Sequence, residues 1–246
     1  MSAVATRLCW TIFRVNLLIA ITIATMILVC YTDLDTAVAA ETRVDLPSAT
    51  GIHDLIFETA TGEAMRYSLA LPTQTPRDGT QVLVLVLHYG GQPSGFYGHP
   101  LLEQLIQPAL TTLNAVLVAP VSLDGDWSTA ANERAVLELF AMIERSYSTD
   151  PARRLITGYS MGGAGTWHMV AQYPGHFSAA VAISGFKPIA VPSCKTPIYA
   201  LLSRADSIFD PDQLQGLIDE LIAAGCKAKV DFIDDIDHYN IPAFAP

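Results

Sequence analysis

Residues 156–165, ITGYSMGGAG, place one serine among glycines directly after a run that reads as a buried strand. Gly158-Tyr159-Ser160-Met161-Gly162 fits the pattern G-x-S-x-G. Where a strand turns directly into a helix, the crowded bend needs glycine at both flanking positions, and the serine hydroxyl is lifted out of the sheet. A glycine-rich turn with an incidental serine is the alternative. The position between strand and helix favours Ser160 as a nucleophile.

A nucleophilic serine needs a base, and in architectures with this motif the chain order is serine, acid, histidine. Of the six histidines, three precede Ser160. His168 lies about 12 Å along the helix that leaves the turn, and His176 precedes the next strand, at the wrong end of the sheet. His238 follows the last predicted strand. A lone loop histidine can be a surface residue, but position and elimination predict His238 as the base.

An acidic residue must orient that base. Asp206 follows the strand at 196–203 within three residues, and this position predicts Asp206 as the acid. Asp210 is the rival, although its role as N-cap of a helix explains it without catalysis. The remaining acidic candidates crowd the base in sequence and read more simply as a solvated loop: Asp234, Asp235 and Asp237.

Two backbone donors are expected for the oxyanion, the negatively charged oxygen of the tetrahedral intermediate. One is the N–H of Met161, the residue after the nucleophile. The other should come from the loop after the strand at 81–88, and we predict Gly90, with Tyr89 as the alternative. His88 is expected to hold this loop in shape.

The elements around these residues predict an α/β fold. Short apolar strands alternate with helices, which indicates a mostly parallel sheet covered by helices on both faces, with sites beyond the carboxyl ends of the strands. Helices are predicted at 101–113 (interrupted by Pro108), 131–147, 161–173 and 211–224. Eight strands are predicted, the first two as an edge hairpin: 52–59, 64–72, 81–88, 114–120, 153–160, 177–185, 196–203 and 228–234.

The first forty residues differ from the rest. Arg7 and Arg14 precede an uncharged apolar stretch, 15–31, and a small-residue run ends at Ala40. This pattern predicts a signal peptide over 1–40, an exported protein, periplasmic or secreted, and one domain over 41–246. The alternative is an uncleaved membrane anchor at 15–31. In an exported protein, Cys194 and Cys226 are candidates for a disulfide at the end of the sheet opposite the active site.

Composition narrows the functional classes. The chain has 246 residues, 51% of them hydrophobic, which allows one sizeable core. Its net charge of −10 argues against nucleic acid as a partner, because phosphate binding needs clustered Lys and Arg.

The sequence resembles compact α/β-hydrolases of the dienelactone hydrolase, carboxylesterase/phospholipase and polyhydroxybutyrate-depolymerase-like group. The resemblance covers roughly 81–239, and the elbow segment DPARRLITGYSMGGAGTWHMV is its most specific part. It implies hydrolysis of carboxylic esters by a serine triad with no metal and no cofactor. Tyr89 stands where these relatives usually have glycine, the final helix is short or absent, and no insertion large enough for a lid is visible.

The predicted substrate is therefore a small-molecule ester in an open cleft, with short or aromatic acyl groups preferred. Tyr89, Tyr97 and Trp127 are the predicted substrate-binding residues, and ordinary packing is the alternative for Tyr97 and Trp127. Two other functions stay open: a peptidase of the prolyl-oligopeptidase-like kind and a non-catalytic binding protein on the same fold. A binding protein has no evident use for serine, acid and histidine in this order.

Overall fold

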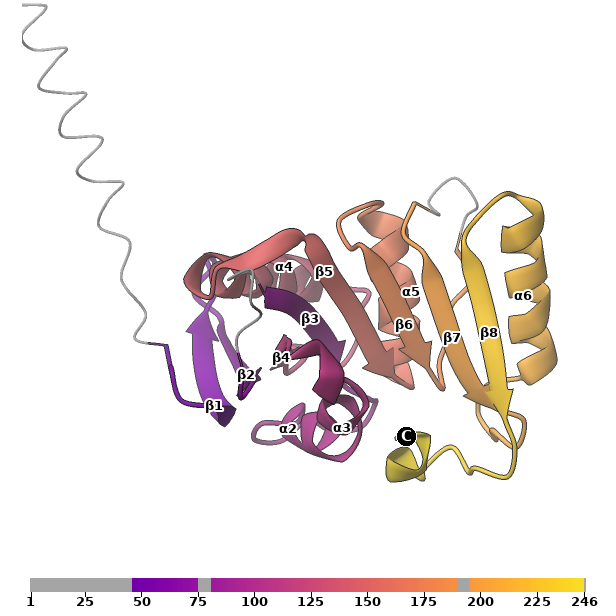
Figure 1. Ribbon diagram of the computed structural model, residues 1–246, viewed down its shortest axis with the longest axis horizontal. Coiled ribbons are helices and arrows are strands. Elements are labelled where there is room, and N and C mark those ends of the chain that lie inside the picture. Colours follow the sequence, from indigo (N-terminus) through magenta and orange to yellow (C-terminus); the bar gives the residue numbers. More distant parts are fainter. Residues whose placement is uncertain (1–45, 75–80, 190–194, 246) are drawn as a thin grey trace, which may run out of the picture. The chain divides into compact units, whose positions relative to one another are not determined.

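A single eight-stranded sheet organises the chain in the computed structural model, which describes residues 46–74, 81–189 and 195–245 (Figure 1). The strand order is β1-β2-β4-β3-β5-β6-β7-β8. β1 and β2 form an antiparallel edge hairpin, β2 also runs antiparallel to β4, and β3 to β8 pair in parallel. The strands are β1 (Gly51–Glu58), β2 (Ala64–Leu71), β3 (Gln81–Leu87), β4 (Val116–Pro120), β5 (Thr149–Tyr159), β6 (Ala179–Ile183), β7 (Ile198–Ser203) and β8 (Ala228–Ile233). The predicted mostly parallel sheet is thus confirmed.

Helical segments connect the strands. The longer ones are α4 (Ala130–Ser146), α5 (Met161–Gln172) and α6 (Pro211–Ala223), close to the predicted bounds. The segment predicted as a helix over 101–113 with an interruption at Pro108 is helical and irregular, and Pro108 has no N–H to donate to residue 104. The segment changes from α to π to α to 3-10 geometry: α2 (His99–Leu101), η1 (Leu102–Ile106), α3 (Gln107–Ala109) and η2 (Thr111–Leu113). A short 3-10 helix, η4 (Ile241–Phe244), stands at the position of the final helix.

The helices cover both faces of the sheet. On one face, η1 and Phe244 of η4 pack in one apolar cluster with alternate residues of β3, namely Val82, Val84 and Val86. On the other face α5 crosses β3, where Gly165 approaches Leu87. In Figure 1, α4 and α5 lie behind the strands. Every residue of β3 is buried, because helices cover the strand on both faces of the sheet. This explains why its sequence is a nearly continuous apolar run.

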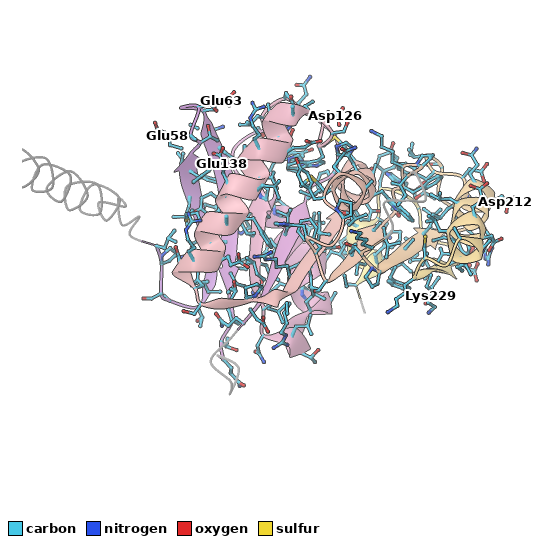
Figure 2. The ribbon with its side chains drawn as sticks, turned by 90° about the horizontal axis from the view of Figure 1, so that it is seen from above. Glu58, Glu63, Asp126, Glu138, Asp212 and Lys229 are labelled. Carbon is cyan, nitrogen blue, oxygen red and sulfur yellow. The ribbon has the colours of Figure 1, made fainter. Side chains whose placement is uncertain are left out.

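The edge hairpin is tied to α4 by a polar contact at its turn. The backbone N–H of Ala60 donates to Oε2 of Glu138 at 2.9 Å. Figure 2 shows Glu138 on α4 near the hairpin that carries Glu58 and Glu63. This hydrogen bond joins the turn of the β1–β2 hairpin to α4, the helix that precedes β5.

Several sequence-based predictions fall outside the described residues. The candidate leader at 1–40 is one, and Cys194 is another, so the Cys194–Cys226 disulfide stays a prediction. Among the helices that the structure does describe, none is long and apolar enough to cross a membrane. The connection from β6 to β7 contains no helix in its described parts, 184–189 and 195–197.

Two glycines inside helices should respond oppositely to alanine. Gly216 lies in α6, where an added Cβ would have no atom within 4 Å, so Gly216→Ala should raise the free energy of unfolding by about 0.5–1 kcal/mol through helix propensity. At Gly162 a Cβ would lie 1.9 Å from the carbonyl oxygen of Leu87, so Gly162→Ala should lower it by roughly 2 kcal/mol or more. Chemical denaturation of both variants measures this difference, and equal effects would contradict the close approach of α5 to β3.

Candidate active site

Ser160 occupies a strained bend between β5 and α5. Its backbone has φ of 55° and ψ of −116°, in a region that residues other than glycine rarely adopt. A Cβ on Gly158 would lie 2.2 Å from the carbonyl oxygen of Gly162, so the two glycines of the motif allow the strand and the helix to come this close. The Ser160 N–H donates to the carbonyl of Ile183 on β6 at 2.9 Å, which fixes the bend against the neighbouring strand. The sequence therefore presents this hydroxyl at the carboxyl edge of the sheet.

The structure brings Ser160, His238 and Asp206 together in one hydrogen-bonded chain. Ser160 Oγ lies 2.9 Å from His238 Nε2, and His238 Nδ1 lies 2.8 Å from Asp206 Oδ2. With Nδ1–H donating to the carboxylate, Nε2 is free to accept the serine proton. The side chains of His238 and Asp206 are 5% and 0% exposed, which keeps water from competing for these bonds. The order of contacts is the one that activates a serine by general-base catalysis.

The turn after β7 holds the carboxylate of Asp206. Its Oδ1 accepts the backbone N–H groups of Ile208 at 2.9 Å and Phe209 at 2.8 Å, which leaves Oδ2 for His238. The rival Asp210 is exposed and caps α6, where it accepts the N–H of Asp212 at 2.9 Å. The structure therefore places Asp206, and not Asp210, against the histidine.

The loop that carries His238 is fastened beneath the site. The hydroxyl of Tyr159 donates to the carbonyl of His238 at 2.5 Å. Phe244 of η4 packs edge-on against the Tyr159 ring, with centroids 5.4 Å apart. The residue before the nucleophile thus positions the base as well, and the short final helix supports it.

The two predicted oxyanion donors lie side by side. A Cβ on Gly90 would lie 3.6 Å from Cβ of Met161, the first residue of α5. Gly90 and Ser160 also line the same cleft. Backbone N–H groups from the helix N-terminus and from the glycine loop can therefore approach one substrate oxygen.

His88 holds the glycine loop from inside. Its Nε2 accepts the backbone N–H of Ser122 at 3.0 Å, so this nitrogen carries no proton, and Nδ1–H donates to the carbonyl of Tyr89 at 2.7 Å. Burial lowers the pKa of His88 to about 4. A neutral His88 thus joins the loop after β3 to the loop after β4, which agrees with the prediction that His88 holds the loop after β3 in shape.

Trp127 corrects one sequence-based prediction. It is 2% exposed and does not line the cleft. Its Nε1–H donates to the carbonyl of His88 at 2.9 Å, and its ring packs against His88 with centroids 4.8 Å apart. An indole that finds a buried acceptor can leave the surface entirely, so Trp127 supports the loop after β3 from inside and lies outside the cleft.

Tyr97 is also absent from the residues that line the cleft, while Tyr89 is among them. The Tyr97 hydroxyl donates to the carbonyl of Gly90 at 3.3 Å, and its ring packs against Tyr89 at 5.1 Å between centroids. Of the three predicted substrate-binding residues, the structure therefore places only Tyr89 in the cleft.

The cleft at Ser160 has a volume of about 530 Å³ and is open to solvent. The sequence analysis did not predict four residues of its wall: Tyr159, Ile208, Tyr239 and Ile241. The available signal was their position, because Ile208 comes two residues after Asp206 and Tyr239 directly follows His238. The full lining is Tyr89, Gly90, Tyr159, Ser160, Ile208, His238, Tyr239 and Ile241.

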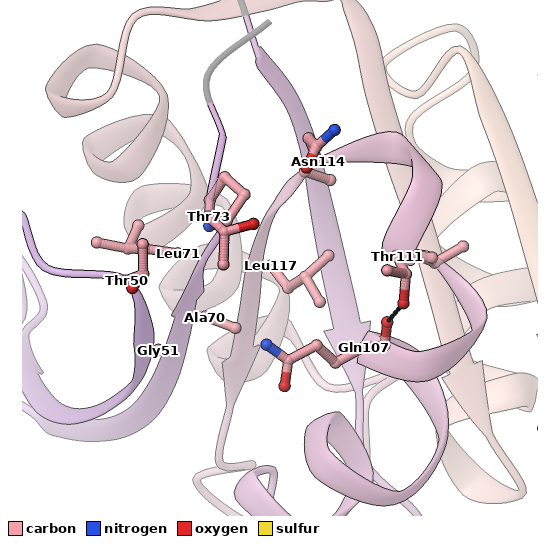
Figure 3. Close-up of a pocket in the computed structure, with 12 residues that line it drawn as sticks. Thr50, Gly51, Ala70, Leu71, Thr73, Gln107, Thr111, Asn114 and Leu117 are labelled. Carbon is pink, nitrogen blue, oxygen red and sulfur yellow. Dashed lines mark hydrogen bonds between the residues drawn. The ribbon is translucent and has the colours of Figure 1, made fainter.

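A second cavity of about 240 Å³ lies near the edge hairpin, between the start of β1, the end of β2 and the α3 region (Figure 3). Figure 3 shows Gln107, Thr111 and Asn114 around it, and the residues that line it include no titratable side chain. It therefore offers no acid–base chemistry. Within the described part of the chain, no group of three or more His, Cys, Asp and Glu could hold a metal ion.

Comparison with known proteins agrees with this geometry. The model of the Esterase family ("Putative esterase") matches residues 59–216. No curated protein matches the chain.

Three solved structures show the same fold. A thermostable esterase is 22% identical with a TM-score of 0.61, covering 75% of this chain; this chain spans 55% of that one. The fluorophosphonate-binding serine hydrolase F of Staphylococcus aureus is 13% identical with a TM-score of 0.63, covering 79% and 94% of the two chains. A "putative dienelactone hydrolase" of Klebsiella pneumoniae is 19% identical with a TM-score of 0.56, covering 78% and 88%.

Neutral, buried His88 makes stability depend on pH. Its folded pKa of about 4 lies below the ordinary value of 6.5, so as pH falls the unfolded chain takes up the proton first. Neutral His88 therefore contributes to the free energy of unfolding in full above pH 6.5. The contribution is lost as pH falls toward 4, and the loss is roughly 3 kcal/mol at most. Denaturant unfolding of the wild type and of His88→Gln at pH 7 and pH 4.5 measures it. The variant should start less stable and lose less on acidification; equal losses would show that His88 is not the responsible group.

Proposed function

The chain belongs to the Esterase family, a family of carboxylic ester hydrolases, and on that premise we propose that it cleaves esters through an acyl-enzyme formed on Ser160. The observation that carries the proposal is the hydrogen-bonded chain from Ser160 Oγ through His238 to Asp206, with distances of 2.9 and 2.8 Å. A catalytic serine needs this order of contacts.

In acylation, Ser160 Oγ attacks the ester carbonyl carbon while His238 Nε2 takes the serine proton. Asp206 holds the imidazole in the required tautomer and stabilises the imidazolium. The N–H groups of Met161 and Gly90 bind the oxygen on which negative charge develops. The tetrahedral intermediate then collapses, the bond from the carbonyl carbon to the alcohol oxygen breaks, and His238 gives its proton to the departing alkoxide.

In deacylation, water takes the place of the alcohol. His238 removes a proton from the water while the water oxygen attacks the acyl carbonyl carbon. When the tetrahedral intermediate collapses, His238 returns the proton to Ser160 Oγ. The products are the carboxylic acid and the free enzyme. The cleft is open to solvent, which can supply this water.

The cleft favours small, uncharged esters. Apart from His238, no residue that lines it carries a basic side chain, so an anionic substrate gains no ion pair there. Because the cleft is open to solvent, most of a long acyl chain would stay in water and gain little. We therefore keep the expectation of short or aromatic acyl groups.

Substitution of the three residues tests the mechanism. Ser160→Ala and His238→Ala should each lower kcat on 4-nitrophenyl acetate by about three orders of magnitude or more, because a triad acts as a unit. Asp206→Asn should cost far more activity than its matched control Asp210→Asn, which changes only a helix cap. A fluorophosphonate probe should label the wild type and not Ser160→Ala.

Two results would contradict the proposal. Near-normal turnover by Ser160→Ala would exclude Ser160 as the nucleophile, and absence of both turnover and labelling in the wild type would favour a non-catalytic binding protein. Faster cleavage of a peptide 4-nitroanilide than of the corresponding 4-nitrophenyl ester would favour a peptidase.

We further propose that the protein is exported and that cleavage follows Ala39 or Ala40, as the pattern of the first forty residues suggests. An oxidising compartment would allow Cys194 and Cys226 to pair. The intact mass of the protein isolated from its natural host should correspond to a chain that starts at residue 40 or 41 with no free thiol. A full-length mass in the membrane fraction would support the anchor, and two free thiols would exclude the disulfide.

A further inference from the structure

Exposed apolar side chains gather at one wall of the cleft. In the described part of the chain, the exposed large apolar residues are Ile56, Ile208, Ile222 and Tyr239, and two of these four line the cleft at Ser160. Ile208 is 56% exposed and Tyr239 is 75% exposed. Covering exposed apolar surface with a ligand is favourable, so apolar side chains next to a reactive group can contribute to substrate binding.

The turns that carry Asp206 and His238 fix the backbone of Ile208 and Tyr239. The N–H of Ile208 donates to Asp206 Oδ1 at 2.9 Å, the same carboxylate that holds His238. The N–H of Tyr239 donates to Asp237 Oδ1 at 2.9 Å, and the Tyr239 ring stands edge-on to the His238 imidazole with centroids 5.2 Å apart. The backbone that places the acid and the base thus also places Ile208 and Tyr239.

The chemistry decides which half of an ester lies against them. His238 Nε2 must reach the oxygen of the departing alcohol to protonate it, whereas the carbonyl oxygen must turn toward Met161 and Gly90. The alcohol therefore lies on the His238 side of the cleft, where Tyr239 follows the base and Ile208 follows the acid.

We propose that Ile208 and Tyr239 form a subsite for the alcohol part of the ester, and that it takes an uncharged aromatic or branched apolar alcohol. This inference rests on the proposed ester hydrolysis and adds which part of the substrate these side chains select. An aromatic alcohol can pack against the Tyr239 ring. Asp237 beside Tyr239 disfavours an alcohol that carries a carboxylate or phosphate.

Acetate esters of primary alcohols of similar acidity isolate this subsite, because they share one acyl-enzyme and differ only in the leaving group. We expect kcat/KM of the wild type to rise at least fivefold from ethyl acetate to 2-phenylethyl acetate. Tyr239→Ala and Ile208→Ala should each lower kcat/KM on 2-phenylethyl acetate at least threefold more than on ethyl acetate, as expected for a lost apolar contact. Tyr239→Phe should retain the preference, since it keeps the ring.

Two variants serve as matched controls. Ile56→Ala on β1 and Ile222→Ala on α6 remove side chains of comparable exposure, 61% and 53%, outside the cleft, and should leave the preference unchanged. A second series varies the acyl group with ethanol as the constant alcohol, and Tyr239→Ala should leave the ratio of ethyl phenylacetate to ethyl acetate within twofold.

Each alternative gives a distinct result. Equal losses of kcat/KM on ethyl and 2-phenylethyl acetate would mean that Tyr239 acts on His238 and not on the alcohol, and a loss confined to the acyl series would place the acyl group there. Unchanged selectivity with an altered oligomeric state would assign the surface to contact between copies of the chain. These results all overturn the subsite in an active esterase, whereas a wild type that neither hydrolyses esters nor reacts with fluorophosphonate overturns the proposed function itself.

Discussion

The bend at Ser160 is the constraint on which the site depends. A serine at φ of 55° costs about 1–3 kcal/mol, and the surrounding contacts must hold it there. Its N–H is bonded to Ile183, and its carbonyl accepts the N–H of Ala164 at 3.0 Å within the first turn of α5. Gly185 passes so close that a Cβ would lie 2.0 Å from the same carbonyl oxygen. The end of β6 and the start of α5 therefore clamp the nucleophile from both sides.

Distance along the sheet explains the remaining supports. Asp206 follows β7 and His238 follows β8, which lie two and three strands away from β5 in the sheet order. The segment after β8 must therefore run back over the sheet edge to reach Ser160. Tyr159 holds the carbonyl of His238, and Phe244 packs on Tyr159 within the apolar cluster of the same face. One turn of 3-10 helix is enough for this purpose, because the hydrogen bond from Tyr159 supplies the direct restraint.

The strands and the three residues that follow them could be predicted from the sequence, because they depend on hydrophobic periodicity and on the order of elements along the chain. Ser160, Asp206 and His238 each follow a strand that reads clearly, and parallel strands bring their carboxyl ends to one edge, so their proximity followed. Trp127 could not be predicted in the same way. An aromatic residue in a loop turns inward or outward according to the partners it finds, and its partner, the carbonyl of His88, is 39 residues away. For the same reason the exposure of Ile208 and Tyr239 was not visible in their residue types.

Buried side chains set the geometry of the site, whereas exposed side chains form the apolar part of the cleft wall. Those that set the catalytic geometry, His88, Trp127 and Tyr159, are at most 2% exposed and have their polar atoms bonded to backbone groups. Substituting them disturbs packing and hydrogen bonds together, with large costs. Ile208 and Tyr239 are bonded to Asp206 and Asp237 through their backbone N–H groups, which a change of side chain leaves in place, and the Tyr239 ring also packs against the His238 imidazole. Selectivity for the substrate can therefore vary with these two side chains while the hydrogen bonds that hold Asp206 and His238 stay in place.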